Sequence, residues 1–276
     1  MILNEIENYL EGVSWHGDYI SACCVFHEDA NPSMLVFEHG FKCLSCNEKG
    51  SLQKLLNQIN VTDVESAPRV FTKSPTPWGK WLHSRSIPEL AWDAHQLLKR
   101  NPSQGIYLKE RGIGGAIEEL RLGWLGGYYF FPILGRNKQV NGLVIRAGKT
   151  LHELAGVRYM TPPNQPPTLY VPSWKLIEEQ EEIRIVYGII DSITLFLLDK
   201  AVITGSAGKT INPELLNQIR KPIIIIPDRN EDADALKLSG HLGWRGRVNR
   251  ISYPDDSKDC NDIYLQHGKQ SLLSVI

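Results

Sequence analysis

The stretch RIVYGIIDSITL, residues 184–195, decides the fold of this chain. A short β-branched run ends at Tyr187, a glycine turn follows at Gly188, and a longer apolar run starts around Asp191. The first run predicts a buried strand and the second predicts a helix. A strand that enters a helix through a glycine turn brings polar groups to the carboxyl edge of a sheet, so Asp191 is a candidate functional residue.

The same alternation continues toward the C-terminus. Strand-like runs at 201–204, 221–228 and 247–255 alternate with helix-like segments at 212–219 and 232–243. This order predicts an α/β fold with a mostly parallel sheet and helices on both faces. Acidic residues fall where the strands should end, and we expect them at one edge of the sheet: Asp191, Asp228, Asp232, Asp234, Asp259 and Asp262.

Four of the five cysteines lie within the first 46 residues, and three of them, with one histidine, form two pairs with two-residue spacing, Cys24-x2-His27 and Cys43-x2-Cys46. Clustered cysteines in a chain without a signal peptide favour metal binding over disulfides. Three thiolates and one imidazole complete a tetrahedral shell, which predicts a structural Zn²⁺ site. Cys23 could replace Cys24, but only Cys24 keeps the spacing. The residues between the pairs predict two short strands.

Composition and charge set the wider organisation. The chain has 276 residues, enough for two modest domains, and no apolar run of bilayer length or signal peptide, so we expect a cytoplasmic protein without a membrane partner. Residues 61–77 are rich in Pro, Ser and Thr and read as a linker. Residues 61–176 carry 15 Lys and Arg against 8 Asp and Glu, whereas both flanking segments are acidic, which favours a polyanion on the middle segment.

The string GSAGKT at 205–210 looks like part of a phosphate-binding loop. The full pattern needs a glycine at position 203, where this chain has Ile203. An ordinary strand-to-helix loop is the better interpretation. Contact between Lys209 and a nucleotide phosphate remains open.

The cysteine motif extends beyond its spacing. The string from Cys24 through Pro32 and Ser33 to Gly50 resembles the zinc-binding domain of DnaG-type primases of bacteria and phages. The segments YLKERGI, FFPI, GLVIR and RYMTPP resemble the basic half of the primase polymerase domain, and residues 187–262 resemble its Toprim half. The resemblance implies a zinc-binding domain at 1–60, a linker at 61–77, a basic template-binding half at 78–176 and a Toprim domain at 177–276.

The resemblance also implies a function. The chain would be a DNA primase that makes short RNA primers from ribonucleoside triphosphates on a single-stranded DNA template, in a bacterial cell or a phage-infected host. Because no P-loop ATPase follows, we expect a separate replicative helicase. The implied residues fall into three groups: catalytic Asp191, Asp228, Asp232 and Asp259; Mg²⁺ or Mn²⁺ ligands Asp191, Asp228, Asn230 and Asp232; template contacts Arg146, Lys149 and Arg158.

Two residues depart from the family pattern. Tyr187 stands where the family has a glutamate, and Asn230 stands where it has an aspartate. Either nearby acids such as Glu231, Asp232 or Asp234 compensate, or the chain has lost catalysis. The alternative to an active primase is therefore a catalytically degenerate zinc and Toprim protein that binds nucleic acid or replication partners. A Toprim nuclease is disfavoured, because nucleases usually lack the zinc domain and the basic half.

Overall fold

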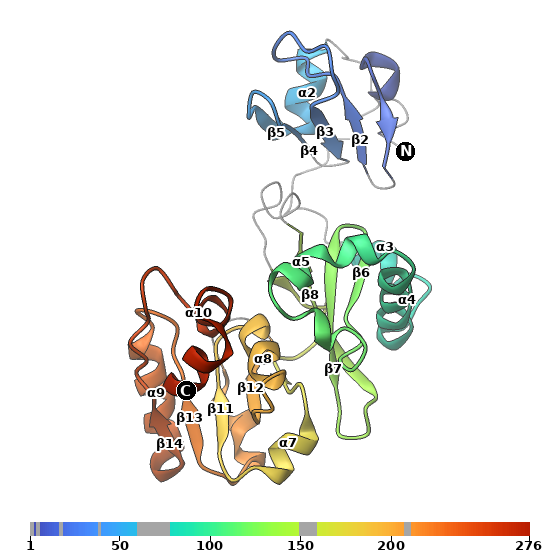
Figure 1. The fold of residues 1–276 in the computed structure, drawn as a ribbon. Helices are drawn as coiled ribbons and strands as arrows, with labels where there is room; N and C mark the ends of the chain where they lie inside the picture. The colour runs from blue at the N-terminus through green and yellow to red at the C-terminus, as the bar shows by residue number, and fades with distance from the viewer. Residues whose placement is uncertain are drawn as a thin grey trace. The chain divides into compact units, whose positions relative to one another are not determined.

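The computed structural model describes residues 3, 6–16, 19–37, 40–59, 78–148, 159–206 and 211–276 (Figure 1). The chain forms two compact units, one from Met1–Gly79 with Ala147–Arg158 and the other from Lys80–Arg146 with Tyr159–Ile276. Within the described part of the chain, no helix is long and apolar enough to cross a membrane.

The first unit is an antiparallel sheet followed by a helix. Its five strands pair in sequence order: β1 (Ser14–Trp15), β2 (Tyr19–Ala22), β3 (Met34–Phe37), β4 (Gly40–Cys43) and β5 (Lys49–Ser51). A short 3-10 helix, Glu7–Tyr9, precedes the sheet, and α2 (Leu52–Gln58) follows it, capped by the Ser51 side chain. Alternate residues such as Ile20 and Val36 are buried, whereas Tyr19 and Phe37 face outward. The two strands predicted between the cysteine pairs are therefore β3 and β4.

The second unit begins with helices on a four-stranded sheet. The helices are α3 (Trp78–Trp81), α4 (Ile87–Arg100), α5 (Ile106–Glu110) and two 3-10 turns, Pro102–Gly105 and Gly114–Ala116. Ser86 and Glu89 form a capping box that starts α4. The strands run in the order β6 (Gly123–Leu125), β7 (Tyr128–Leu134), β8 (Val140–Ala147) and β9 (Tyr159–Met160). Strands β7 and β8 are neighbours in this sheet and follow each other in the chain, and α4 lies alongside β6 (Figure 1).

The C-terminal part of this unit is the predicted parallel sheet. Its order is β10 (Leu169–Tyr170), β12 (Val202–Gly205), β11 (Ile183–Ile185), β13 (Ile223–Ile225) and β14 (Gly246–Val248), and only β10 is antiparallel to its neighbour. The helices are α7 (Trp174–Glu179), α8 (Ile189–Phe196), α9 (Asp232–Leu242) and α10 (Cys260–Val275). Residues Pro213–Gln218 and Gly243–Arg245 are 3-10 helices, so the segment predicted as a helix at 212–219 takes the tighter form.

Apolar cores cover both faces of the parallel sheet. Ile183 and Ile185 pack with α7 and α9, while Val186, Val202 and Ile224 pack with α8 and α10. The core on the side of α8 and α10 also contains Phe131 and Val144 of the four-stranded sheet, so the two halves of the unit share one interior. Since β12 and β13 flank β11 on opposite sides, the crossover direction reverses at β11, and its carboxyl end is the expected place for a functional site.

Candidate functional site

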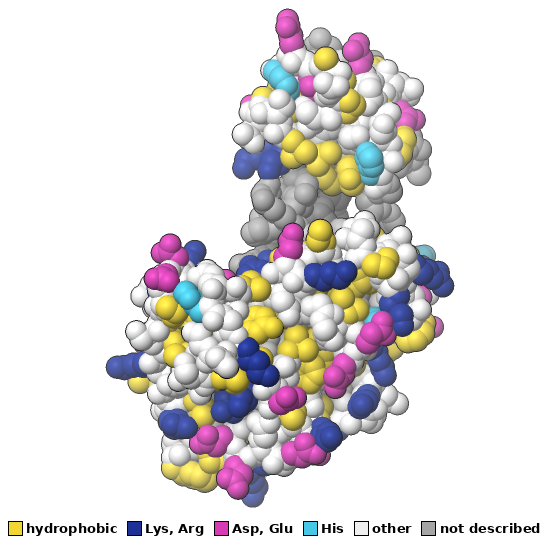
Figure 2. Space-filling model, in the orientation of Figure 1, with side chains coloured by type: hydrophobic (Ala, Val, Ile, Leu, Met, Phe, Trp, Pro, Cys, Tyr) yellow, Lys and Arg dark blue, Asp and Glu magenta, His cyan; other side chains and the backbone are white. Residues whose placement is uncertain are grey.

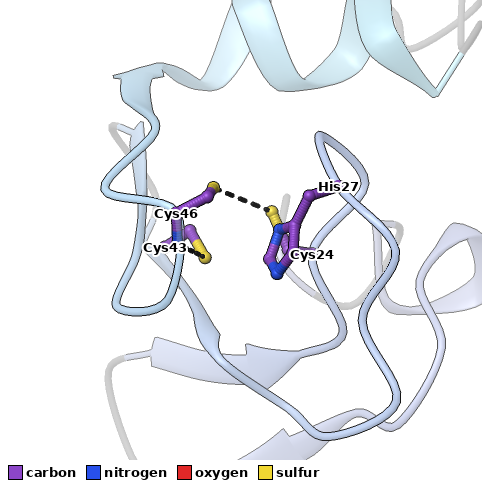
Figure 3. Close-up of side chains that lie close together, drawn as sticks. All are labelled: Cys24, His27, Cys43 and Cys46. Atoms are coloured by element: carbon purple, nitrogen blue, oxygen red, sulfur yellow. Dashed lines mark hydrogen bonds between the residues drawn. The ribbon is translucent and has the colours of Figure 1, made fainter.

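The predicted zinc ligands lie together in the first unit. The ligand atoms of Cys24, His27, Cys43 and Cys46 are all within 4.8 Å of one another, and their side chains point toward a common centre (Figure 3). The Sγ atoms of Cys24 and Cys46 are 3.9 Å apart. Tetrahedral zinc with Zn–S bonds of about 2.3 Å requires sulfur atoms about 3.8 Å apart. The four residues therefore fit the ion in number, type and spacing.

Backbone amides of the two tight turns already point at the sulfur atoms. The amide of Phe26 donates to Cys24 Sγ at 3.5 Å, and the amides of Ser45 and Cys46 donate to Cys43 Sγ at 3.3 and 3.4 Å. Burial raises the pKa of the Cys24 thiol to about 12, so a cation is needed to hold this sulfur as a thiolate. The two-residue spacing thus supplies both the ligands and the dipoles that support their charge.

Asp29 organises the loop that carries His27. Its carboxylate accepts a hydrogen bond from the Cys24 amide at 2.8 Å and another from the Ser33 hydroxyl. The Nε2 atom of His27 lies 4.0 Å from Asp29 Oδ1, and its buried Nδ1 has no hydrogen-bond partner. A histidine with one nitrogen unpartnered and the other near a carboxylate has the arrangement of a zinc ligand with its supporting acid.

A second candidate site lies at the switch point of the parallel sheet, where Asp259 and Asp228 lie close enough to Asp191 for their charges to repel its carboxylate. These three residues are called the acidic cluster below. Gly188 allows the arrangement, since a Cβ atom there would collide with the Asp191 carboxylate. Asp191 Oδ1 accepts the Asn261 amide at 2.8 Å, and Asp259 Oδ1 accepts the Asp262 amide at 2.8 Å. Both acids thus bind the N-terminus of α10, where negative charge is favoured.

The acidic cluster is electrostatically strained. Burial, together with repulsion by Asp259 and Asp228, raises the pKa of Asp191 well above its usual range. Burial also raises the pKa of Asp259, with a further contribution from Asp262. A bound divalent cation relieves such repulsion, and Mg²⁺ and Mn²⁺ prefer carboxylate oxygens. The three acids are therefore of the chemical type that a divalent metal prefers, although their oxygens do not lie as close together as the four zinc ligands do.

The other predicted metal ligands are placed differently. Asp232 begins α9, is half exposed, and pairs with Arg250 at 3.7 Å. Asn230 is exposed and has a left-handed backbone, with φ of 69°, a conformation that asparagine tolerates better than most residues. In the described ranges, the cysteine–histidine set is the only group of three or more potential ligands close enough together to hold an ion.

Tyr187 lies two residues beyond the end of β11, near Asp228 of the acidic cluster. The side chain is 6% exposed, and its buried Oη has no hydrogen-bond partner. Burial, with the charges of Asp234 and Asp228, raises the pKa of Tyr187 to about 12. The hydroxyl is therefore neutral near pH 7 and cannot supply the charge of a carboxylate ligand.

Of the predicted template contacts, only Arg146 lies in the part of the chain that the structure describes, and it is buried. Arg146 is 8% exposed, and its guanidinium lies 4.3 Å from the Tyr107 ring centroid and 5.6 Å from that of Tyr159. Lys149, Arg158 and Lys209 lie outside the described residues. On the visible face of the second unit, Lys and Arg are interspersed with Asp and Glu (Figure 2). The excess positive charge of the middle segment does not form one continuous patch on that face.

Sequence reasoning missed two residues beside the acidic cluster, Arg111 and Asn261. Arg111 Nη1 donates to Asn261 Oδ1 at 3.2 Å and lies 3.5 Å from Asp262 Oδ1. Arg111 belongs to the YLKERGI segment and Asn261 to the range 187–262, so the resemblance included both residues without revealing that they meet.

Two further surfaces could contact a ligand. On the zinc-binding sheet, the His16 and Tyr19 rings stack at 5.0 Å and the Tyr19 and Phe37 rings lie 5.2 Å apart. In the second unit, a pocket of about 540 Å³ lies between the start of α4 and the β7–β8 turn. Trp92, Arg121 and Lys138 are among the residues that line it. Trp92 is 57% exposed there. Neither surface could be predicted from the sequence, because a single tryptophan or tyrosine belongs to no recognisable motif.

Comparison with known proteins agrees with the first unit. Residues 2–74 match the family model of the CHC2 zinc finger, the zinc ribbon of DnaG. This match includes all four predicted ligands and confirms the resemblance drawn from their spacing. No curated protein sequence matches the chain.

Solved structures agree on the fold of the whole chain. The zinc-binding and RNA polymerase domains of the Aquifex aeolicus primase match over 99% of this chain and 82% of that chain, with a TM-score of 0.53 and 20% identity. The RNA polymerase domain of Mycobacterium tuberculosis primase DnaG covers 68% of this chain and 80% of its own, with a TM-score of 0.56 and 17% identity. A DnaG primase catalytic domain bound to single-stranded DNA covers 67% and 77%, with a TM-score of 0.53 and 15% identity. The predicted α/β architecture, a zinc ribbon followed by a primase fold, is confirmed.

Proposed function

We propose that this protein is a DNA primase that synthesises short RNA primers on single-stranded DNA by metal-dependent nucleotidyl transfer. The observation that carries the proposal is the acidic cluster around buried Asp191 at the switch point of a primase-type fold. A CHC2 zinc finger in the same chain supports the same conclusion. The division into residues 1–60, 61–77, 78–176 and 177–276 is part of the proposal.

In this proposal the acidic cluster holds Mg²⁺ or Mn²⁺, and Asn230 and Asp232 approach when nucleotide is present. The metal neutralises triphosphate charge and stabilises the attacking and leaving oxygens. The chain itself contributes the N-terminus of α10, which supports Asp191 and Asp259 as anions. Tyr187 can offer only a neutral hydroxyl to a phosphate oxygen.

The template would lie against the positively charged middle segment. Arg146, Lys149 and Arg158 are its proposed contacts, and Lys209 is the proposed contact to nucleotide phosphate. The zinc ribbon would recognise a short trigger sequence, and the stacked His16, Tyr19 and Phe37 are suited to contact unpaired bases. A separate helicase partner stays a prediction.

One observation favours a second candidate function. Tyr187 is buried and uncharged at the position where a carboxylate is expected, which weakens metal binding. A chain with the same fold and no catalysis would bind nucleic acid or replication partners. This degenerate form is the alternative to an active primase.

Primer synthesis from labelled ribonucleotides on mixed-sequence single-stranded DNA, with Mg²⁺ and Mn²⁺ compared, separates the two functions. We expect primers, with Mn²⁺ more effective than Mg²⁺ because Mn²⁺ binds N and O ligands more tightly. Asp228→Ala should abolish synthesis, whereas Asp256→Ala, at an exposed aspartate three residues before Asp259, should not. If wild type and Tyr187→Glu are both inert with either metal on varied templates, the alternative function stands.

A further inference from the structure

Asn261 is a buried residue beside the acidic cluster whose side-chain amide uses both of its donors and its oxygen in hydrogen bonds. It is 1% exposed and lies in the first turn of α10. Its Nδ2 donates to the Arg111 carbonyl and to Thr194 Oγ1, each at 2.8 Å. Its Oδ1 accepts from Arg111 Nη1 at 3.2 Å, and its backbone amide donates to Asp191 Oδ1 at 2.8 Å.

These bonds connect three separate parts of the second unit. Arg111 follows α5, Thr194 lies in α8, and Asn261 begins α10. The side-chain bonds fix where the Asn261 backbone lies, and the backbone amide in turn orients the Asp191 carboxylate. The position of Asp191 therefore depends on a side chain that contacts the other half of the unit.

The connection continues toward the proposed template contact. The Arg111 guanidinium lies 5.9 Å from the Tyr107 ring centroid, and the Arg146 guanidinium lies 4.3 Å from the same centroid. Both distances are within cation–π range. An unbroken series of contacts thus runs from Asp191 through Asn261, Arg111 and Tyr107 to Arg146.

The structure assigns Asn261 the role of a positioning residue that holds Asp191 for metal binding and joins the acidic cluster to the Arg111 segment. This inference rests on the proposed function, because it takes Asp191 as a metal ligand. The role requires an amide. Thr194 Oγ1 donates its own hydrogen to the Ile190 carbonyl, so Thr194 and the Arg111 carbonyl both present acceptors that an aspartate cannot satisfy.

The test compares Asn261→Asp, Asn261→Ala and Thr194→Val in the zinc-loaded full chain. Manganese binding is followed by electron paramagnetic resonance, and Asp191→Asn identifies the signal of the acidic cluster. Primer synthesis is measured against Mn²⁺ concentration, and hydrogen exchange is followed in residues 106–113 and 189–197. The matched control is Asn249→Ala, because Asn249 Nδ2 also donates to a distant carbonyl, that of Val275, at 2.8 Å.

We expect Asn261→Asp and Asn261→Ala to weaken Mn²⁺ binding by about tenfold, as removal of a residue that orients a metal ligand does elsewhere. Exchange should quicken in both segments, Thr194→Val should show the same changes more weakly, and Asn249→Ala should show none. Unchanged or tighter Mn²⁺ binding by Asn261→Asp would overturn the inference, as would Asn261→Ala behaving like the control or wild type failing to bind Mn²⁺. Wild type that binds Mn²⁺ but makes no primer contradicts only the proposed function.

Discussion

At the scale of single residues, Asp191 shows the strongest conflict between stability and chemistry. It is 5% exposed, and burial with two neighbouring carboxylates raises its pKa well above its usual range. An acid whose pKa is raised by folding binds more protons in the folded state than in the unfolded state. The free energy of unfolding therefore falls as the pH rises from the pKa of the unfolded state, about 4, through the pKa of the folded state. In the absence of divalent metal, ionised Asp191 therefore destabilises the second unit.

Replacing Asp191 with asparagine tests this sign. Asp191→Asn keeps an acceptor for the Asn261 amide and removes the charge, so the second unit should unfold about 3 °C higher at pH 8 without divalent metal. At pH 5 the difference should shrink, because the raised pKa of Asp191 leaves a larger fraction of the wild-type acid protonated as the pH falls. Calorimetry at the two pH values measures both effects. An equal loss of stability at both would contradict the account, and primer synthesis should be lost in either case.

Tyr187 can be tested with two substitutions that act in opposite ways. Its hydroxyl is buried without a partner, so Tyr187→Phe breaks no hydrogen bond and should change the free energy of unfolding by less than about 1 kcal/mol. Tyr187→Glu adds a carboxylate beside the acidic cluster and should strengthen Mn²⁺ binding and raise primer synthesis. Reduced primer synthesis by Tyr187→Phe at unchanged stability would show that the hydroxyl contacts substrate.

At the scale of elements, the two candidate sites are built by different means. The turns around Cys24 and Cys43 bring ligands and amides together within a few residues. The acidic cluster needs the end of β11, the first turn of α8 and the N-terminus of α10 to meet. The zinc ribbon is also small, and a domain of this size usually requires its metal to fold.

Zinc removal should therefore affect only one set of elements. Cys43→Ser combined with Cys46→Ser should eliminate bound zinc and unfold β2–β5 and α2, while α4 and the parallel sheet stay folded. Metal analysis together with hydrogen exchange by segment checks both parts. Protection of residues 19–58 that persists without zinc would contradict the prediction. Ser45→Ala is a suitable control, because the substitution keeps the backbone amide that donates a hydrogen bond to Cys43 Sγ.

At the scale of the whole molecule, charge is distributed unevenly between the parts of the chain. The middle segment has a net charge of +7, whereas residues 1–60 have −5 and residues 177–276 have −3. Single-stranded DNA should therefore bind chiefly to residues 78–176, with an affinity that falls steeply as salt is added.

Arg146 and Arg158 should contribute to that binding. The double substitution Arg146→Ala and Arg158→Ala should weaken DNA affinity and flatten its dependence on salt, as measured by fluorescence anisotropy. Because Arg146 is stacked between Tyr107 and Tyr159, its loss also removes packing, and Arg146→Lys with Arg158→Lys is the control that keeps charge. Unchanged affinity in the alanine variant would remove both residues from the template path.

The zinc site and the type of fold could both be predicted from the order of residues along the chain. Two-residue spacing at Cys24 and Cys43 places ligands on one side of a turn, a matter of local backbone geometry. Alternating buried strands and helices imply a mostly parallel sheet, and the glycine turn at 188 marks the edge where polar groups gather. These features depend on neighbours in the chain, so they can be read directly from the sequence.

Only the tertiary structure decided which polar groups meet. Asp191 accepts a hydrogen bond from the Asn261 amide, which is 70 residues away in the sequence. Arg111 donates to the same asparagine across 150 residues of sequence. The sequence named Arg146 only as a template contact, and the structure shows it buried against the rings of Tyr107 and Tyr159. Sequence periodicity predicts which face of an element is buried, but partners across the core depend on how separate elements pack, and that packing fixes the electrostatics of the acidic cluster.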